Sequence, residues 1–326
     1  MRLRLSSLLA VLSLSFLVAA PSAALSSSNL YVFGDSLVDA GNTQALALAF
    51  AQPDPTPAGS GYFSGRFTNG ITFADQVNVA VEATNSVRSG APANGDNFAY
   101  GGARARTNAD FLPDLTAQVN SYLGVHPVAD ANALYLINAG GNDVRDITLG
   151  GLSGAARQAV IDAARIAVTT AVSTLQTAGA TLANIWVVGV GDVGAIPEIL
   201  ALGGGAPAAG TSAATDLNNA ILANLPAGDN FFNTMALMGA VGANPAAYGL
   251  PAGINQTNAC LGSGTPNPNG PPTCTNYVFF DTVHPTSVVS QVIGSNLLAA
   301  IVPEPGTASL MAIGLVAIGI RRRTRH

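Results

Sequence analysis

The sequence predicts an α/β domain in which helices cover both faces of a parallel sheet. Short apolar runs, of the kind that suits buried parallel strands, alternate with longer stretches whose apolar residues recur at helical spacing. Strands and helices that alternate in this way usually form a parallel sheet between two helical layers. The 326 residues, 48 % hydrophobic and only 10 % charged, suffice for one packed domain with long loops.

Residues 1–24 are typical of a secretory signal peptide. Arg2 and Arg4 supply the positive start, an apolar stretch runs from Leu8 to Val18, and small residues follow up to Ala24. Export machinery recognises this order, and the apolar stretch is short for a membrane span. We therefore expect residues 1–24 to be removed and the folded domain to occupy residues 25–302. An uncleaved anchor is the alternative.

Four apolar runs are expected to form strands: 30–33, 133–138, 184–190 and 277–280. Helical periodicity is found over residues 155–178, 216–225 and 287–301, and Gly179 is expected to end the first of these helices. Two segments interrupt the pattern, 52–70 and 239–274. Loops of this length without structure of their own are usually functional or disordered, so both are candidates for the walls of a substrate cleft.

The charged residues exclude several classes of function. All 13 basic residues are Arg, and without Lys there is no Walker A phosphate loop, no Schiff-base catalysis and no Ser-Lys dyad. Six of the Arg lie in the two ends of the chain, so residues 25–302 carry seven Arg against seventeen acidic residues, a balance of −10. An acidic body is repelled by phosphate backbones, and we expect no binding of nucleic acid.

Ser36 is the candidate nucleophile. It stands in Gly34-Asp35-Ser36-Leu37, where the first predicted strand gives way to a predicted helix. The free N–H groups at a helix start can stabilise developing negative charge. The alternative is that Ser36 or Asp35 only caps the helix. A G-x-S-x-G elbow is absent, which disfavours the α/β-hydrolases.

Histidine is rare in this chain, which has three. His326 belongs to the tail, and His126, which precedes a proline in a predicted loop, is expected at the surface. His284 follows the last predicted strand and lies three residues after Asp281. One loop can hold both side chains, and a carboxylate that orients an imidazole is the second half of a Ser-His-Asp system. A D-x-x-H pair alone is weak evidence, because an Asp that caps a turn beside a surface His is the common alternative.

Two further segments could supply hydrogen-bond donors to a tetrahedral oxyanion. Residues 97–103 include the Gly101-Gly102 turn, whose amides can approach a ligand closely. Residues 137–143 follow a predicted strand and present the carboxamide of Asn142. An oxyanion needs two or three such fixed donors.

Together these segments resemble the GDSL, or SGNH, family of esterases and lipases. The blocks occur in order over roughly residues 30–301: Gly34-Asp35-Ser36-Leu37, then 97–103, then Gly140-Gly141-Asn142-Asp143, then 281–286. Residues 65–70 also resemble the G-R-F-[ST]-N-G stretch of the family. The resemblance implies a flavodoxin-like three-layer α/β/α sandwich around a parallel sheet.

The same resemblance implies roles for single residues. Ser36 would be the nucleophile, His284 the general base and then acid, and Asp281 the group that orients His284. The oxyanion donors would be the Ser36 N–H, the Gly102 N–H and the Asn142 side chain, with Gly101 as the alternative to Gly102. No metal or organic cofactor is implied. The chemistry expected is hydrolysis of acyl or lipid esters through an acyl-enzyme. The alternatives are an exopolysaccharide O-acetyl esterase and a non-catalytic surface or matrix protein on the same scaffold.

The C-terminal segment, residues 303–326, resembles a PEP-CTERM sorting signal of Gram-negative bacteria. It has a Pro303-Glu304-Pro305 box, an apolar stretch over 308–320 and the basic run 321–323. The resemblance implies export, recognition by an exosortase, transient anchoring in the inner membrane through this segment, and removal of the tail. The protein would then reside in the cell envelope or outside the cell. A simple C-terminal anchor is the alternative.

The two cysteines, Cys260 and Cys274, flank a segment rich in Gly, Pro and Asn. An exported protein can form disulfides, and a bridge that closes so short a loop adds ~3 kcal/mol. The spacing fits neither a zinc site nor a C-x-x-C redox pair. We expect a structural disulfide rather than two free thiols.

Overall fold

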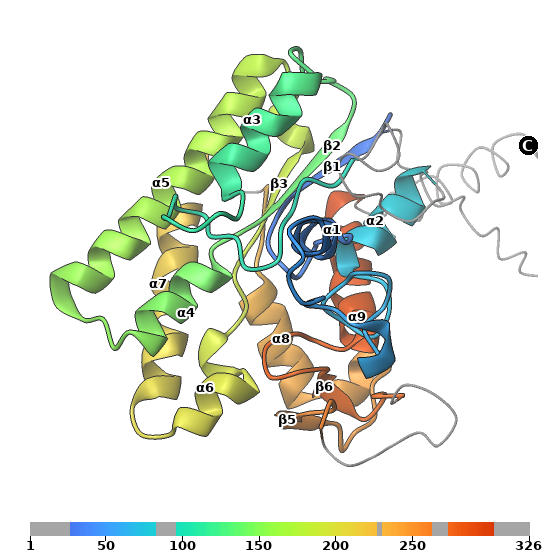
Figure 1. The fold of residues 1–326 in the computed structure, drawn as a ribbon, viewed down its shortest axis with the longest axis vertical. Coiled ribbons are helices and arrows are strands. Elements are labelled where there is room, and N and C mark those ends of the chain that lie inside the picture. The colour runs from blue at the N-terminus through green and yellow to red at the C-terminus, as the bar shows by residue number, and fades with distance from the viewer. Residues whose placement is uncertain (1–26, 83–95, 227–229, 263–272, 303–326) are drawn as a thin grey trace, which may run out of the picture.

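The structure is a computed structural model that describes residues 27–82, 96–226, 230–262 and 273–302 (Figure 1). The predicted signal peptide and the sorting segment 303–326 lie outside the described residues, and the domain limits 25–302 stay a prediction. Within the described ranges, none of the helices has the length and apolar character needed to cross a membrane.

A parallel sheet forms the centre of the molecule. Its strands lie side by side in the order β1 (Leu30–Gly34), β2 (Leu134–Asn138), β3 (Ile185–Val188) and β4 (Phe231–Phe232). On the outer side of β1, Asn97 forms a parallel bridge with Val32, and the Phe98 N–H donates to the Val32 carbonyl. The order in space is therefore the segment 96–100, β1, β2, β3, β4. This is the 2-1-3-4-5 order of flavodoxin-like sheets, and the predicted fold class is confirmed.

Two layers of helices cover the sheet, because successive side chains of a strand point to opposite faces. The face that carries Leu30, Val32 and Leu136 packs against helices α2 (Phe73–Glu82), α8 (Thr234–Ala243) and α9 (Ser287–Ile301). The face that carries Tyr31, Phe33 and Ile137 packs against α3 (Leu115–Val125), α4 (Gly141–Leu149), α5 (Gly154–Ala178) and α7 (Ala206–Leu222). Figure 1 shows α3, α5 and α7 on one side of the sheet and α2, α8 and α9 on the other.

Three of the four predicted strands are confirmed as β1, β2 and β3, each of them fully buried. The fourth run does form a strand, β6 (Tyr277–Phe279), but it does not join the central sheet. It pairs with β5 (Asn255–Ala259), and the two strands form a separate small sheet whose residues are mostly half-buried or exposed. This small sheet brings the loop after β6 to the carboxyl ends of the central strands.

The predicted helices exist, and one of them is longer than expected. The stretches 155–178 and 287–301 correspond to α5 and α9, and Gly179 ends α5 with a φ of +122°. The predicted helix 216–225 is α7, which begins ten residues earlier, at Ala206. Pro207 marks this start, because proline is favoured in the first turn of a helix.

The two interrupting segments differ in structure. Segment 52–70 is a loop with one short 3-10 turn at Ala58–Ser60 (η1). Segment 239–274 was expected to be a loop, and this is wrong, because it holds the end of α8, a 3-10 turn at Pro245–Tyr248 (η5) and strand β5. The sequence conceals α8 because the helix is apolar all round, and periodicity identifies only helices that have a polar face.

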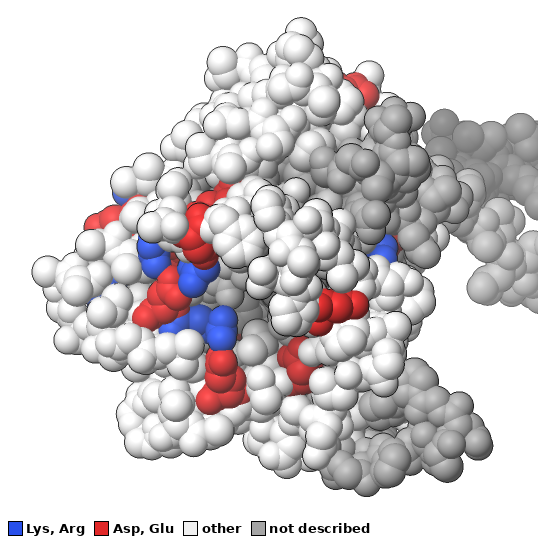
Figure 2. Space-filling model, in the orientation of Figure 1, with Lys and Arg blue, Asp and Glu red and all other residues white. Residues whose placement is uncertain are grey.

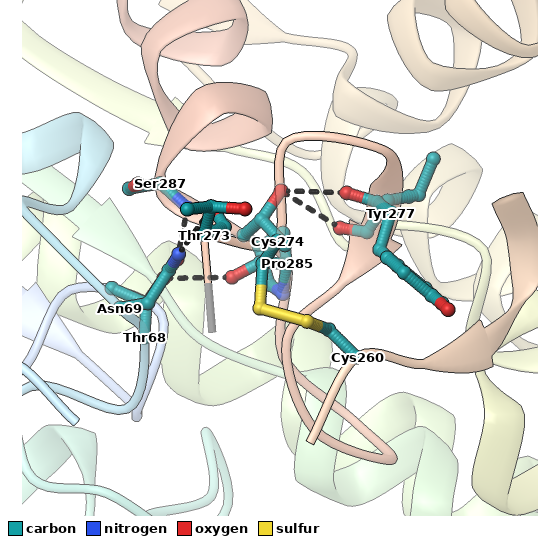
Figure 3. The surroundings of a disulfide bond; sticks show 10 residues. Thr68, Asn69, Cys260, Thr273, Cys274, Tyr277, Pro285 and Ser287 are labelled. Carbon is teal, nitrogen blue, oxygen red and sulfur yellow. Dashed lines mark hydrogen bonds between the residues drawn. A yellow bond between two sulfur atoms is a disulfide. The ribbon is translucent and has the colours of Figure 1, made fainter. Parts of the chain in front are cut away.

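Cys260 and Cys274 form a disulfide with Cα atoms 5.6 Å apart (Figure 3). Both cysteines are buried and pack with Phe280 into a small third core, against which Tyr62 lies. The bridge therefore links the end of β5 to the segment that leads into β6, the strand that precedes the loop with Asp281 and His284.

Candidate active site

Ser36 lies just beyond the carboxyl end of β1, in a turn that spans Asp35 to Val38, and only 8 % of the residue is exposed. The Val38 and Asp39 N–H groups close this turn by donating to the Asp35 carbonyl. Gly34 permits the close approach of β2, since a Cβ there would lie 2.1 Å from the Asn138 carbonyl oxygen.

The expected position of Ser36 at a helix start is wrong, because helix α1 (Asn42–Ala49) begins six residues later. Asp39 serves the start of this helix: its carboxylate accepts the N–H groups of Gly41, Asn42 and Thr43. Neither Ser36 nor Asp35 caps α1.

The loop between β6 and α9 holds His284 and Asp281. His284 Nε2 lies 2.7 Å from Ser36 Oγ, and His284 Nδ1 lies 2.7 Å from Asp281 Oδ2. The backbone N–H groups of Val283 and His284 donate to Asp281 Oδ1 at 2.9 and 2.8 Å. Burial raises the pKa of Asp281, but the neighbouring His284 ring and these hydrogen bonds lower it more, so the pKa of this carboxyl lies below its ordinary value. The structure thus brings the three predicted side chains into one hydrogen-bonded chain.

Tyr62 is a site residue that the sequence did not reveal. Its hydroxyl donates to Asp281 Oδ2 at 2.9 Å, and its ring packs edge-on against Phe280. Burial, together with the charge of Asp281, raises the pKa of the Tyr62 hydroxyl, which therefore keeps its proton and remains a donor. No motif marks this residue, which is one tyrosine in a loop rich in glycine and serine.

The rest of segment 52–70 supports the same loop. The ring of Phe67 lies 5.2 Å from the His284 ring, Thr68 Oγ1 donates to the Pro285 carbonyl at 2.8 Å, and the Ser287 N–H donates to Asn69 Oδ1 at 2.8 Å. Figure 3 shows Thr68 and Asn69 against Pro285 and Ser287, close to the disulfide. This segment contributes no residue to the cavity beside Ser36, so its expected role as a cleft wall is wrong. It holds the loop of Asp281 and His284 instead.

Asn142 lies at the start of α4, directly after β2. Its Nδ2 donates to the Ala103 carbonyl at 2.8 Å, and its Oδ1 accepts from Arg145 Nη1 at 3.3 Å. Ser36 and Asn142 follow adjacent parallel strands at the point where the strand order reverses, the usual place for a ligand site in such sheets.

Of the two neighbouring glycines, Gly102 has the free amide. The Gly101 N–H donates to Asp39 Oδ2 at 2.9 Å, whereas the Gly102 N–H has no acceptor among the described residues. Gly102 also has a φ of +88°, which favours glycine. Within the described part of the chain the Ser36 N–H likewise has no acceptor. Both amides are therefore available to a bound oxyanion.

Two buried carboxyls adjoin these residues. Burial raises the pKa of Asp35 to about 6, although the Leu37 N–H bond lowers it. Burial likewise raises the pKa of Asp143 to about 7, against the lowering effect of the Ala105 and Arg106 N–H groups. Both side chains are at most 3 % exposed, so their ionised forms lack the solvation that water would give them.

His126 is far less exposed than a surface histidine. It is half-buried, and its ring stacks on Tyr122 at 4.9 Å between centroids and lies 5.2 Å from Tyr31. Its ring thus contacts aromatic residues of α3 and β1. It does not belong to the hydrogen-bonded group of Ser36, His284 and Asp281.

A cavity of about 550 Å³ opens beside Ser36, and Asn142 also belongs to its wall. Most of the lining is apolar and comes from α8, α9, β6 and the segment after β3. It includes Val193, Ile196, Met235, Met238, Ile254 and Ile293. Segment 239–274 contributes to this wall, as expected, through Gly239, Ile254 and Gln256.

The arginines near this cavity have carboxylate partners. Arg145 and Glu198 form a bidentate pair with both distances at 2.7 Å, and Arg104 and Arg106 both bind Asp146. Figure 2 shows acidic and basic side chains beside one another on this face, with uncharged surface around them. Because the arginines already have carboxylate partners, the cavity offers a largely apolar site rather than an anion site.

Comparisons with known proteins give a family match over most of the chain. Residues 30–297 match the model of the family described as GDSL-like lipase/acylhydrolase, and residues 302–323 match the PEP-CTERM protein-sorting motif. The chain is 30 % identical to a GDSL esterase/lipase of Arabidopsis thaliana over 315 residues, 81 % of this chain and 85 % of that protein. It is 34 % identical over 188 residues to Lipase 1 of Photorhabdus luminescens, 57 % of this chain and 26 % of that protein. A solved phospholipase A1 of Streptomyces albidoflavus aligns with 82 % of this chain and 96 % of its own, at 17 % identity and a TM-score of 0.41.

Proposed function

The chain belongs to the GDSL-like lipase/acylhydrolase family and is an ester hydrolase, and we propose that it works through an acyl-enzyme on Ser36. The observation that carries this proposal is the 2.7 Å distance between Ser36 Oγ and His284 Nε2, with Asp281 on the other ring nitrogen. A nucleophile, its base and the group that orients the base are the three parts that such chemistry requires.

The reaction has two halves. Ser36 Oγ attacks the ester carbonyl carbon while its proton passes to His284 Nε2, and the oxyanion binds to the Ser36 N–H, the Gly102 N–H and Asn142 Nδ2. The intermediate collapses, His284 gives its proton to the leaving alcohol, and an acyl ester on Ser36 remains. Water then attacks this ester while its proton passes to Nε2. As this second intermediate collapses, His284 returns the proton to Ser36 Oγ and the acid leaves. Asp281 keeps its ionised form throughout and stabilises the protonated imidazole.

The apolar wall of the cavity supports acyl or lipid esters as substrates. An acetyl group would leave most of a 550 Å³ cavity without contacts, whereas a longer acyl chain buries apolar surface at about 25 cal/mol per Å². Hydrolysis of exopolysaccharide O-acetyl esters is the second candidate. The sorting motif at residues 302–323 indicates export, and an exported enzyme can meet polysaccharide outside the cell.

Activity measurements separate these candidates. We expect p-nitrophenyl esters of longer acids to be cleaved with a higher kcat/KM than p-nitrophenyl acetate, and acetylated polysaccharide to release little acetate. Release of acetate from polysaccharide without cleavage of any longer acyl ester would contradict the acyl-ester assignment.

Substitutions test the roles of the side chains. Ser36→Ala is expected to abolish labelling by a fluorophosphonate, which the wild type should take up. His284→Ala should lower kcat by about 10⁴ or more with the fold intact, while His126→Ala should leave it nearly unchanged. A well-folded wild type that does not react with the fluorophosphonate would favour a non-catalytic surface or matrix protein.

The motif at residues 302–323 indicates export and sorting in a Gram-negative bacterium. We infer that an exosortase-type machinery recognises it while the segment holds the protein transiently at the inner membrane, and that residues 1–24 and the tail are removed. Intact mass of the protein recovered from the cell envelope tests both cleavages, and retention of Arg321 to Arg323 would contradict removal of the tail.

A further inference from the structure

We propose that Arg145 is a positioning residue, which fixes the orientation of the Asn142 carboxamide and couples it to the loop of Asp281 and His284. The inference rests on the proposed function, in which Asn142 binds the oxyanion. It follows from the partners of one guanidinium group, which contacts Asn142 on one side and Glu198 on the other.

The first contact concerns the direction of the amide. Arg145 lies one helical turn after Asn142 on α4, and its Nη1 donates to Asn142 Oδ1. An Asn side chain has a donor end and an acceptor end, and only the donor end can stabilise an oxyanion. The Ala103 carbonyl accepts one Nδ2 hydrogen at 2.8 Å. With Oδ1 held by Arg145, the second Nδ2 hydrogen remains for the ligand, and a rotation that would present Oδ1 to negative charge is opposed.

The second contact reaches the loop that carries the general base. Arg145 Nε and Nη2 donate to the two carboxylate oxygens of Glu198, each at 2.7 Å. Glu198 lies in the first turn of α6 (Pro197–Leu202), and its backbone N–H donates to the Thr282 carbonyl at 2.9 Å. Thr282 directly follows Asp281. The guanidinium group therefore lies between the predicted oxyanion donor and the loop that places His284 against Ser36.

The fork of arginine is what permits this bridge. A planar guanidinium can bind a carboxylate with two N–H groups and still donate a third in a fixed direction. A lysine ammonium is a compact charge and lacks this fixed fork of donors. The side chains of Arg145 and Glu198 are each 28 % exposed, so the pair is partly screened from water. Arg145 also lines the cavity, close to where the oxyanion would form.

Arg157 is the matched control within the same chain. It pairs with Asp216 at 2.5 Å and links α5 to α7, and it contacts none of the predicted site residues. Its side chain is 21 % exposed, close to the value for Arg145. Removal of either arginine thus breaks one ion pair between helices, but only Arg145 touches Asn142.

A double-mutant cycle tests the proposal on the full chain. Loss of one oxyanion donor costs about 10²–10³ in kcat, which is the loss expected for Asn142→Ala. We expect Arg145→Met to lower kcat about tenfold or more with little change in KM, and to slow fluorophosphonate labelling by the same factor. The Asn142→Ala/Arg145→Met double variant should be no slower than Asn142→Ala alone, because the amide that Arg145 orients is gone. Arg145→Lys should restore little, and Arg157→Met should match the wild type.

Two results would overturn the inference while leaving the proposed function in place. The first is a multiplicative loss in the double variant, since Arg145 would then act independently of Asn142. The second is an equal loss of activity in Arg157→Met. If Arg145→Met does not fold, Glu198→Gln takes its place: it keeps the shape and the backbone bond to Thr282, and it should show a smaller loss that also disappears in the Asn142→Ala background. A wild type that does not react with fluorophosphonate would overturn both the inference and the proposed function.

Discussion

The hydroxyl of Tyr62 and the imidazole of His284 bind the same oxygen of Asp281. The Tyr62 hydroxyl lies 2.9 Å from Asp281 Oδ2, and His284 Nδ1 lies 2.7 Å from it. Two backbone N–H groups occupy the other oxygen. The carboxylate therefore has little freedom to rotate away from the ring that it orients. Among the residues that the structure describes, Tyr62 supplies the one donor that comes from outside the loop.

Tyr62→Phe should consequently lower kcat by about five- to tenfold, which corresponds to about 1 kcal/mol for one hydrogen bond to the orienting carboxylate. KM and the thermal unfolding temperature should change little, because the ring keeps its contact with Phe280. Steady-state kinetics on one ester measures both constants. Tyr248→Phe is a suitable control, since Tyr248 is also half-buried but lies in η5, and an unchanged kcat in Tyr62→Phe would contradict the role assigned to the hydroxyl.

Reduction of the disulfide should affect activity before it unfolds the protein. The bridge closes a short loop and is expected to contribute ~3 kcal/mol to stability. The Cys260 and Leu261 N–H groups donate to the carbonyls of Phe279 and Phe280, so loss of the bridge loosens the strand just before Asp281. We expect kcat to fall in the presence of a thiol reductant under conditions where circular dichroism still reports a folded protein. The Cys260→Ser/Cys274→Ser variant serves as the control, because the reductant should not lower its activity further.

Asp35→Asn should stabilise the protein at pH 8 but not at pH 3.5. The pKa of Asp35 is about 6 in the folded protein, against 3.8 for the free side chain, so folding disfavours the ionised form. At pH 3.5 the carboxyl is mostly neutral in both the folded and the unfolded protein, so its burial hardly lowers the free energy of unfolding. As the pH rises from about 4 to about 6 the cost appears, and above pH 6 it reaches about 3 kcal/mol. Urea unfolding of both proteins at the two pH values measures the difference, and an equal gain at pH 3.5 would show that ionisation is not the cause.

Gly191→Leu should shift the preference towards short acyl chains. Gly191 is half-buried, lines the cavity, and a Cβ built there meets no atom within 4 Å, so a larger side chain can occupy cavity space. The kcat/KM for esters of long acids should fall several-fold more than that for p-nitrophenyl acetate, because the lost apolar contact is worth ~0.8 kcal/mol per methylene. Gly124→Leu offers the matched control on α3, where a Cβ is also unobstructed. An unaltered chain-length profile in Gly191→Leu would argue against the cavity as the acyl site.

The parts of the fold that the sequence predicted are those whose signal is local. Strands β1 to β3 are continuous apolar runs, and α5 and α9 begin and end where their apolar spacing does. Helix α8 was missed because no polar face marks it. The β6 strand was recognised, but its partner β5 could not be, because four of the five residues of β5 are polar and most of the strand is exposed.

The same distinction applies to the site. Ser36, Asp281, His284 and Asn142 stand in short motifs of chemically distinct residues, and such motifs can be identified in one sequence. Tyr62 and Asp281 are 219 residues apart in the sequence, and no local pattern indicates a contact between them. The choice between Gly101 and Gly102 likewise depended on Asp39, which occupies the Gly101 amide in the folded protein.

The two atoms nearest to the proposed bond-making step, Ser36 Oγ and His284 Nε2, belong to residues 248 positions apart, one after the first strand and one in the last loop of the domain. A chain still emerging from the ribosome, or still unfolded during export, therefore holds a serine without its base. Under the proposed mechanism, ester hydrolysis therefore requires the loop before α9 to pack beside the end of β1, and an unfolded chain is expected to be inactive.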